Sequence, residues 1–469
     1  MSGDQGAALE AASVQSIFGG PTPAEQAANK AAQAYWSWTT TPPEERTKVL
    51  NRAADEMIGA TERLADIAAR EIGAAPAWID FNIDVAAQVL RRAGELTALM
   101  TDEVIVNAER RTRSVLRRQS VGVVLGFAPW NAPIALAVRA VAAPLACGNT
   151  VVLKASEHCP ETHQATIDVL RAAGLPEGVA TSVSNTPETS AEVMEALIRH
   201  PAVRRINFTG STRVGRLVAA SAARELKRCL LELSGKAPLI VLEDADLDAA
   251  AEAAALGAFF NQGQICMSTE RIIVLQAVAD AFVEKLLACT ARLVAADPAE
   301  SDAPLGRLIN HAAADRVRGM IDDAVSKGAR LLVGGEVEGA VMQPAVLDGV
   351  SSAMRLYHEE SFGPVASVMR VADTDEAISI ANDTEFGLAG AVFGADQARC
   401  LDIANRLETG ICQINGPTVY DDASMPFGGM KASGYGRFGG PASIDEFTEL
   451  RWIAQHEAGG PSRLDQLLS

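Results

Sequence analysis

Cys266 is the residue in this chain whose type and position best suit covalent chemistry. It lies within F-F-N-Q-G-Q-I-C-M-S-T-E-R, between two elements that the pattern predicts. An alanine-rich run from Asp246 to Phe260 predicts a buried helix that Asp246 caps and Gly263 stops. The β-branched run from Ile272 to Val274 predicts a strand. A thiol on the intervening turn can face a cleft and attack a carbonyl carbon, although a lone cysteine is more often a small buried hydrophobe.

Such an attack needs two further groups, besides a positive or polar neighbourhood that ionises the thiol. Asn131, held between Pro129 and Pro133 after a buried strand, offers an amide to a developing oxyanion; a simple Asx turn is the alternative. Glu232 lies between two leucines in L-E-L-S-G-K. Apolar surroundings raise a carboxyl pKa towards the range of a general base, and an ordinary surface glutamate is the alternative.

The elements that must position these residues alternate between strands and helices. The stretch 23–100 predicts a helical layer and 114–121 an extended ribbon. Predicted strands are 121–127, 150–154, 179–183, 205–208, 239–242, 366–371, 390–393, 411–414 and 446–455. Predicted helices are 134–146, 163–173, 191–198, a helix from Gly210-Ser211-Thr212 to about 226, 278–295, 312–326, 374–382 and 397–407. The alternation predicts an α/β fold with mostly parallel sheets, and dinucleotides commonly bind at the carboxyl ends of such strands.

Composition limits the classes of function. The 469 residues suffice for two or three domains, and 41 basic against 59 acidic residues give a net charge of −18. This charge argues against nucleic acid and anionic membranes as partners. Five arginines at 110, 111, 113, 117 and 118 are interpreted as a salt-bridged connector. Residues 1–20 are small and polar, which predicts a loose arm.

Seven scattered cysteines show no C-x-x-C pair and no metal-ligand spacing with the six histidines. We therefore expect reduced thiols, a cytoplasmic location and no metal. The start of the chain carries no signal-peptide pattern. The stretch 121–147 holds a single charge, but prolines interrupt it, so we interpret it as buried core instead of a membrane span.

Seven motifs together resemble the NAD(P)-dependent aldehyde dehydrogenase superfamily over nearly the whole chain. They are G-F-A-P-W-N at 126–131, V-V-L-K-A-S-E at 151–157, N-F-T-G-S-T at 207–212, L-E-L-S-G-K at 231–236, N-Q-G-Q-I-C at 261–266, E-E-S-F-G-P at 359–364 and P-F-G-G-M-K at 426–431. The resemblance implies a Rossmann-type NAD-binding domain (1–112 and 122–233), an α/β catalytic domain (234–434) and a small β oligomerisation segment (113–121 and 435–469). It also implies a homodimer or homotetramer.

The resemblance assigns catalytic roles. Cys266 would form a thiohemiacetal whose oxyanion is held by Asn131 and the Cys266 N–H, hydride transfer would leave a thioester, and Glu232 would activate the water that releases an acid.

The resemblance also assigns a nicotinamide cofactor. A carboxylate at Glu157 would bind ribose hydroxyls and repel a 2′-phosphate, which favours NAD, although Lys154 leaves NADP possible as a weaker cofactor. The sequence departs from the family at Ala155, in place of proline, and at Ser234, in place of glycine. The predicted cofactor-binding residues are Phe127, Trp130, Lys154, Ser156, Glu157, Gly210, Ser211, Gly215, Glu360 and Phe362.

The substrate is inferred from K-A-S-E-H-C-P and I-N-G-P-T-V-Y, which resemble the salicylaldehyde and vanillin branch of the family. We therefore expect an aromatic, hydroxylated aldehyde, with Arg139 binding its polar group unless that arginine is paired at the surface. The other predicted substrate-binding residues are Leu136, Trp78, Phe260, Tyr420 and Phe427. Three alternatives stay open: an aliphatic semialdehyde as substrate, acyl transfer to coenzyme A, or a catalytically silent family member that only binds.

Overall fold

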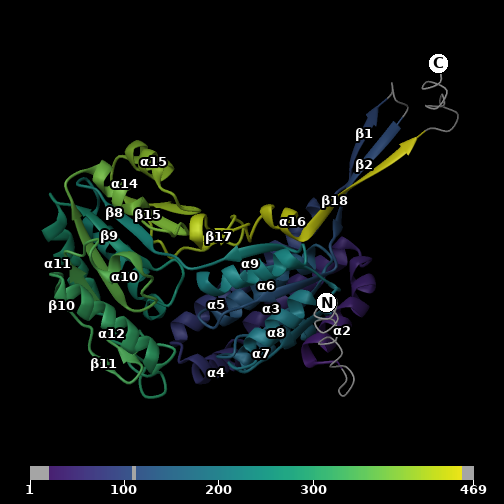
Figure 1. Cartoon of the computed structure of the whole chain (residues 1–469), viewed down its shortest axis with the longest axis horizontal. Helices are drawn as coiled ribbons and strands as arrows, with labels where there is room; N and C mark the ends of the chain where they lie inside the picture. Colours follow the sequence, from purple (N-terminus) through teal and green to yellow (C-terminus); the bar gives the residue numbers. More distant parts are fainter. Residues whose placement is uncertain (1–20, 108–111, 457–469) are drawn as a thin grey trace, which may run out of the picture.

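The computed structural model describes residues 21–107 and 112–456. The expected N-terminal arm, Arg110, Arg111 and the end of the C-terminal segment (457–469) lie outside the described residues. Three larger sheets and one two-stranded sheet organise the rest; two of the larger sheets are covered by helices, and the third extends away from the body (Figure 1). The predicted α/β class is confirmed.

The N-terminal part is the helical layer that the sequence predicts. Three of its four long helices, the first, second and fourth, have proline in their first turn, and a capping box at Thr22 caps the start of the first. The elements are α2 (Pro23–Thr39), α3 (Pro43–Gly59), α4 (Thr61–Ile72), α5 (Pro76–Leu96) and η2 (Thr97–Leu99).

A six-stranded sheet follows, parallel except at the edge strand β17. Its order is β17 (Gly434–Tyr435), β7 (Arg228–Glu232), β6 (Val203–Thr209), β3 (Val123–Phe127), β4 (Thr150–Lys154) and β5 (Ala180–Val183). Helices α6 (Pro133–Ala146), α7 (Pro160–Ala172), α8 (Ser190–Arg199) and α9 (Thr212–Arg224) alternate with the strands. Helices α2, α8 and α9 pack on one face of the sheet, and α6 and α7 on the other.

The apolar stretch 121–147 divides into β3 and α6, both buried, as the sequence predicts. No helix among the described residues is long and apolar enough to cross a membrane.

A seven-stranded sheet carries the second α/β unit. Its order is β10 (Arg330–Val333), β13 (Ala345–Asp348), β14 (Val365–Val371), β9 (Thr269–Leu275), β8 (Ala237–Val241), β15 (Ala389–Phe393) and β16 (Ile411–Ile414), all parallel except β10. On one face pack α10 (Leu247–Phe259) and α11 (Ala279–Thr290), and on the other α12 (His311–Ser326), α13 (Arg355–His358), α14 (Thr374–Asn382) and α15 (Gln397–Arg406).

The third sheet joins distant parts of the chain: β1 (Glu103–Asn107), β2 (Thr112–Ser120) and β18 (Thr448–His456). Arg117 and Arg118 of β2 form ion pairs with Asp102 and Asp445, which confirms the salt-bridged connector for those two arginines. Short elements complete the fold: η3 (Phe260–Gly263), β11 (Val337–Glu338), β12 (Val341–Met342), η4 (Lys431–Ser433) and α16 (Ala442–Phe447). The domain boundaries stay a prediction.

Several element ends differ from expectation. The last strand begins at Thr448 because α16 occupies the residues before it, and the predicted helix 278–295 ends at Thr290. Helix α10 has Asp246 as its N-cap, as predicted, but ends at Phe259. Gly263 does not stop it directly. It closes a left-handed run in which Asn261 and Gln262 also have positive φ, of 49° and 55°.

Candidate active site

A cleft of about 260 Å³ lies between the two large sheets and contains all three predicted catalytic residues. They come from three distant parts of the chain: the loop after β3, the end of β7 and the turn after η3. The cleft is lined by Pro129, Trp130, Asn131, Leu136, Thr209, Gly210, Ser211, Glu232, Leu233, Ser234, Cys266, Glu360 and Phe362. The structure therefore brings together the sulfur, the amide and the carboxyl that the sequence singles out.

Close backbone contacts hold the turn that carries Cys266. A side chain at Gly235 would place its Cβ only 2.1 Å from the Cys266 carbonyl oxygen, so the loop after Glu232 approaches the thiol's own backbone as only glycine permits. Gly263, at φ 69°, likewise lies against the carbonyl of Gly363. These approaches fix the turn without any contribution from a flexible side chain.

Glu232 ends β7 and is almost fully buried. Its Oε1 has no hydrogen-bond partner among the described residues. Burial raises the pKa of Glu232 to about 7, partly offset by a hydrogen bond with the Cys266 thiol. A carboxyl that is half ionised near neutral pH and has an unpaired oxygen facing a cleft can accept a proton from a thiol or from water.

The surroundings of Cys266 differ from the positive neighbourhood that the sequence argument requires. Burial raises the pKa of its thiol, and the nearby carboxyls of Glu232 and Glu360 raise it further, while Arg139 lowers it only weakly. The thiol is therefore neutral at rest. Its proton must pass to an acceptor before attack, and Glu232 is the group in contact with it.

Asn131 is buried and oriented by its neighbours. Its Nδ2 donates to the Gln264 carbonyl at 2.9 Å, two residues before the thiol. The backbone carbonyl of Asn131 accepts hydrogen bonds from Trp78 Nε1 at 2.7 Å and from Asn261 Nδ2 at 3.1 Å. An amide NH₂ has two donors. One of these donors binds Asn131 to the turn that carries Cys266. The second is available to the oxyanion that forms on the aldehyde oxygen when the sulfur attacks.

The geometry agrees with comparisons to known proteins. The model of the aldehyde dehydrogenase family matches residues 13–453. The chain belongs to the aldehyde dehydrogenase family. It is 54% identical to a vanillin dehydrogenase of Pseudomonas fluorescens over 92% of this chain and 89% of that protein. It is 46% identical to a salicylaldehyde dehydrogenase of Pseudomonas sp. (strain C18) over 92% and 90% of the two chains.

Among solved structures, a salicylaldehyde dehydrogenase from Pseudomonas putida G7 complexed with salicylaldehyde superposes with a TM-score of 0.91 at 45% identity. The superposition covers 94% of this chain and 91% of that one. The aldehyde dehydrogenase fold expected from the motifs is thereby confirmed. Members of the family use NAD or NADP and form thiohemiacetals with their aldehydes.

In this aldehyde dehydrogenase, several predicted cofactor residues meet at one edge of the six-stranded sheet. Ser211 caps α9, accepts the Val214 N–H at 3.4 Å and lines the cleft. Lys154 ends β4 and pairs at 3.6 Å with Glu157 of the loop that follows, and Lys154 Nζ also donates to Ser190. β4 and β6 lie on either side of β3 and run parallel to it, so both groups stand at the same carboxyl edge of the sheet, on strands that β3 separates. A helix N-terminus beside a carboxylate fits a dinucleotide's pyrophosphate and ribose.

The cofactor residues divide into two groups. Trp130, Gly210, Glu360 and Phe362 line the cleft together with Ser211. The other predicted cofactor residues are not part of that lining: Phe127, Lys154, Ser156, Glu157 and Gly215. The ring of Phe127 packs in the core 5.4 Å from that of Phe208. Gly215 lets α9 lie close to Leu233, because a Cβ there would stand 2.4 Å from that leucine.

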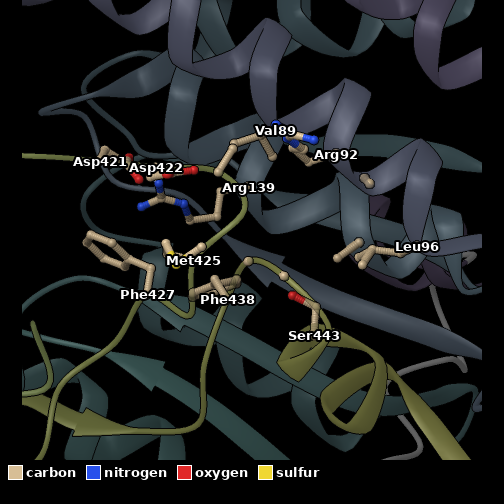
Figure 2. A pocket seen from close by; sticks show the side chains of 15 residues that line it. Val89, Arg92, Leu96, Arg139, Asp421, Asp422, Met425, Phe427, Phe438 and Ser443 are labelled. Carbon is tan, nitrogen blue, oxygen red and sulfur yellow. Dashed lines mark hydrogen bonds and ion pairs between the residues drawn. The ribbon is translucent and has the colours of Figure 1, made fainter. Parts of the chain in front are cut away.

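Arg139 is neither free nor at the surface. Leu136 lines the cleft, and Arg139, one turn later on α6, reaches an adjoining cavity in which its guanidinium is bonded to Asp421 (Figure 2). The guanidinium also lies 4.2 Å above the ring of Phe427. Both partners of the ion pair are nearly buried. The alternative of a surface-paired arginine is wrong in its location, because the arginine is paired but the pair is buried; substrate binding by Arg139 stays a prediction. The pair lies close enough to act on the ionisation of Glu232.

The predicted aromatic residues lie in different places. Trp78 packs against Phe260, with ring centroids 4.9 Å apart, and also against Phe81, directly behind Asn131. Tyr420 is 51% exposed. Asp421 and Phe81 are site residues that were not predicted from the sequence. Phe81 stands three residues after Trp78 on α5, a helical spacing that was a usable signal, whereas nothing near Asp421 indicates its partner 282 residues away.

Proposed function

We propose that this enzyme oxidises an aromatic, hydroxylated aldehyde to its carboxylic acid with NAD. The observation that carries the proposal is the convergence of Cys266, Glu232 and Asn131 in one cleft. Support for the substrate class comes from the similarity to vanillin and salicylaldehyde dehydrogenases.

The residues of this chain account for each proton and charge. Glu232 accepts the thiol proton, and the sulfur attacks the aldehyde carbon. The resulting oxyanion accepts hydrogen bonds from the free N–H of Asn131 and from the backbone N–H of Cys266. A bound nicotinamide ring supplies the hydride acceptor. Glu232 passes the thiol proton to solvent before hydrolysis, so that its carboxylate is again a base. It then takes a proton from the water that attacks the thioester carbon, and cleavage of the C–S bond releases the acid and a thiolate, which takes up that proton.

The Arg139–Asp421 pair favours a neutral, hydroxylated substrate over a semialdehyde. A carboxylate on the substrate would have to compete with Asp421 for a guanidinium that is already bonded. The ring of Phe427 beneath that guanidinium adds an aromatic wall. A phenol hydroxyl can instead hydrogen-bond to the pair without displacing either partner.

Turnover of salicylaldehyde, vanillin and succinate semialdehyde tests the substrate class. We expect kcat/KM for either aromatic aldehyde to exceed that for the semialdehyde by about 10²-fold or more, since an unpaired buried polar group discriminates on that scale. Asp421→Asn removes the charged partner of Arg139 and should therefore reduce the ratio of kcat/KM for the aromatic aldehydes to kcat/KM for the semialdehyde. A wild-type preference for succinate semialdehyde would contradict the proposal, and no NADH from any aldehyde would favour the silent alternative.

The preference for NAD rests on Glu157. Its carboxylate stands beside Lys154, which is buried and already shares its charge with Glu157 and Ser190. A 2′-phosphate would therefore meet a carboxylate without a spare cation. Glu157→Gln should lower the ratio of kcat/KM with NAD to that with NADP by about tenfold. A ratio that stays unchanged would remove Glu157 as its cause.

A dimer or tetramer is proposed through the third sheet. Within the described residues, β18 pairs on one side only, with β2, and thus offers an open edge. The sheet also exposes apolar side chains, among them Trp452 on β18 and Val106 on β1, each 70% exposed. Light scattering should give two or four subunits, and Trp452→Lys should shift the distribution towards smaller species.

A further inference from the structure

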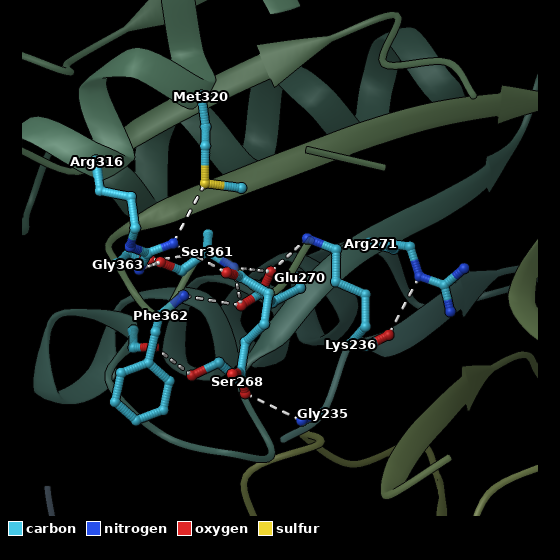
Figure 3. Close-up of polar contacts among 12 residues, drawn as sticks. Gly235, Lys236, Ser268, Glu270, Arg271, Arg316, Met320, Ser361, Phe362 and Gly363 are labelled. Carbon is cyan, nitrogen blue, oxygen red and sulfur yellow. Dashed lines mark hydrogen bonds and ion pairs between the residues drawn. The ribbon is translucent and has the colours of Figure 1, made fainter. Parts of the chain in front are cut away.

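A buried ion pair lies behind the cleft and outside its lining. Lys236 Nζ is bonded to the Glu270 carboxylate, and the two side chains are 0% and 4% exposed (Figure 3). Lys236 follows Glu232 by four residues, and Glu270 follows Cys266 by four. The pair therefore joins the loop of the carboxyl base to the strand that follows the nucleophile.

The same carboxylate binds the backbone of a third segment. The Ser361 N–H donates to both Glu270 oxygens at 2.8 Å, and the Phe362 N–H donates at 3.1 Å. From the other side, Arg316 of α12 donates to the carbonyls of Glu360 and Ser361 (Figure 3). The segment 360–362 is thus held by its donors and its acceptors at once.

This segment needs such support because its conformation is unfavourable. Phe362 has φ 45°, in the left-handed region that is unfavourable for a bulky side chain. Two adjacent N–H groups that point the same way also require an acceptor with two oxygens. A carboxylate provides both, and Lys236 neutralises the charge that remains.

On its opposite side the segment presents two cleft residues. The Glu360 carboxylate accepts the Gly235 N–H at 3.0 Å, and the ring of Phe362 stands edge-on to Trp130 at 5.7 Å. Both line the cleft near the thiol, whereas Glu270 and Lys236 do not. A shift of the segment would therefore move the cleft wall without moving Cys266.

We propose that Glu270, with Lys236, is a positioning residue that holds segment 360–362 in the conformation that binds the nicotinamide side of the cofactor. The proposal rests on the proposed function, which makes that wall a cofactor site. The ion pair contributes to the affinity for the cofactor, and the cleft residues determine the rate of hydride transfer once the cofactor is bound.

The test compares three variants of the full chain. Glu270→Gln keeps the shape and removes the charge. Because it leaves Lys236 buried and unpaired, Lys236→Met with Glu270→Gln is made as a second variant that can fold. Asp348→Asn is the matched control: Asp348 is equally buried, is paired with Arg330 and Arg370, and lies on β13 of the same sheet.

Three quantities are measured: the Kd of NAD by calorimetry, hydrogen exchange of the peptide covering 360–362 without cofactor, and single-turnover hydride transfer at saturating NAD. Both Glu270 variants should raise Kd by about tenfold or more and speed exchange, while hydride transfer falls by less than about threefold. The control should change Kd by less than about twofold.

A folded double variant with wild-type Kd and wild-type exchange would overturn the proposal, as would an equal rise of Kd in Asp348→Asn. Failure of the proposed function looks different, because the wild-type enzyme itself would then bind neither NAD nor NADP. In that case the exchange measurement alone decides whether the pair holds the segment.

Discussion

Two buried glutamates on opposite sides of the cleft wall are used in opposite ways. Glu232, on the cleft side, has one oxygen without a partner, and burial raises its pKa to about 7. Glu270, on the supporting side, has both oxygens bonded, to Lys236 and to two backbone N–H groups. Burial alone therefore does not decide what a carboxyl does; the number of its partners does.

The difference separates reactivity from support. The cleft side keeps unpaired hydrogen-bonding groups, in Glu232 Oε1 and the second N–H of Asn131. Unpaired buried groups cost stability, so this side is where the fold gives up free energy for chemistry. On the supporting side, both oxygens of Glu270 have hydrogen-bonding partners. Variants on the cleft side should lose activity without losing stability, and variants on the supporting side should lose stability first.

Replacing the sulfur is the strongest test of this division. Cys266→Ala should reduce aldehyde oxidation by about 10⁴-fold or more, because Cys266 supplies the only thiol among the described residues that line the cleft. Steady-state NADH production measures the loss, and the thermal midpoint should stay at or above the wild-type value. Retained oxidation would end the assignment of Cys266 as nucleophile.

Removing the base should have the next largest effect. Glu232→Gln should lower kcat by about 10²-fold or more, since no carboxylate remains to activate water. Rapid mixing should still detect a first burst of NADH. Its rate should climb as the pH is raised, because the thiol then ionises without its neighbouring proton acceptor. A variant with wild-type kcat would remove Glu232 from both roles.

The sequence predicted the cleft side far better than the supporting side. Cys266, Glu232 and Asn131 stand in local motifs, and the strand and helix alternation predicted the sheets that bring them together. Lys236 and Glu270 also stand in those motifs, yet their pairing depends on the relative positions of β8 and β9, which no local pattern encodes. Asp421 was missed for the same reason. The left-handed Asn261 and Gln262 were missed because neither is glycine, the residue that usually marks such a turn.

On the supporting side, breaking the ion pair should cost stability. Lys236→Met alone leaves the Glu270 carboxylate buried with only backbone donors, which should destabilise the fold by about 3–5 kcal/mol. The double variant with Glu270→Gln should recover part of this loss. Denaturant unfolding of the wild type, the single variant and the double variant measures these changes in the free energy of unfolding. Equal free energies of unfolding for Lys236→Met and wild type would show that the Lys236–Glu270 pair does not stabilise the fold.

The smallest effect concerns the pH dependence of stability at Glu232. Its pKa is raised, mainly by burial, from 4.5 to about 7, so between these values the folded protein keeps a proton that the unfolded chain releases. Wild-type stability from this group is therefore fully present below about pH 4.5 and lost as the pH rises through 7. Glutamine does not titrate, so Glu232→Gln should equal wild type near pH 4.5 and exceed it by about 2–3 kcal/mol at pH 8.

The control for that comparison is Asp348→Asn. Burial of Asp348 works to raise the pKa of its carboxyl, but hydrogen bonds from Arg370 and Arg330 outweigh it and lower that pKa. The sign is therefore reversed, and this variant should be less stable than wild type at pH 8 and approach it in acid. Thermal midpoints at several pH values give both curves. If the Glu232→Gln and Asp348→Asn curves ran in the same direction, the contrast between an unpaired and a paired buried carboxyl would fail.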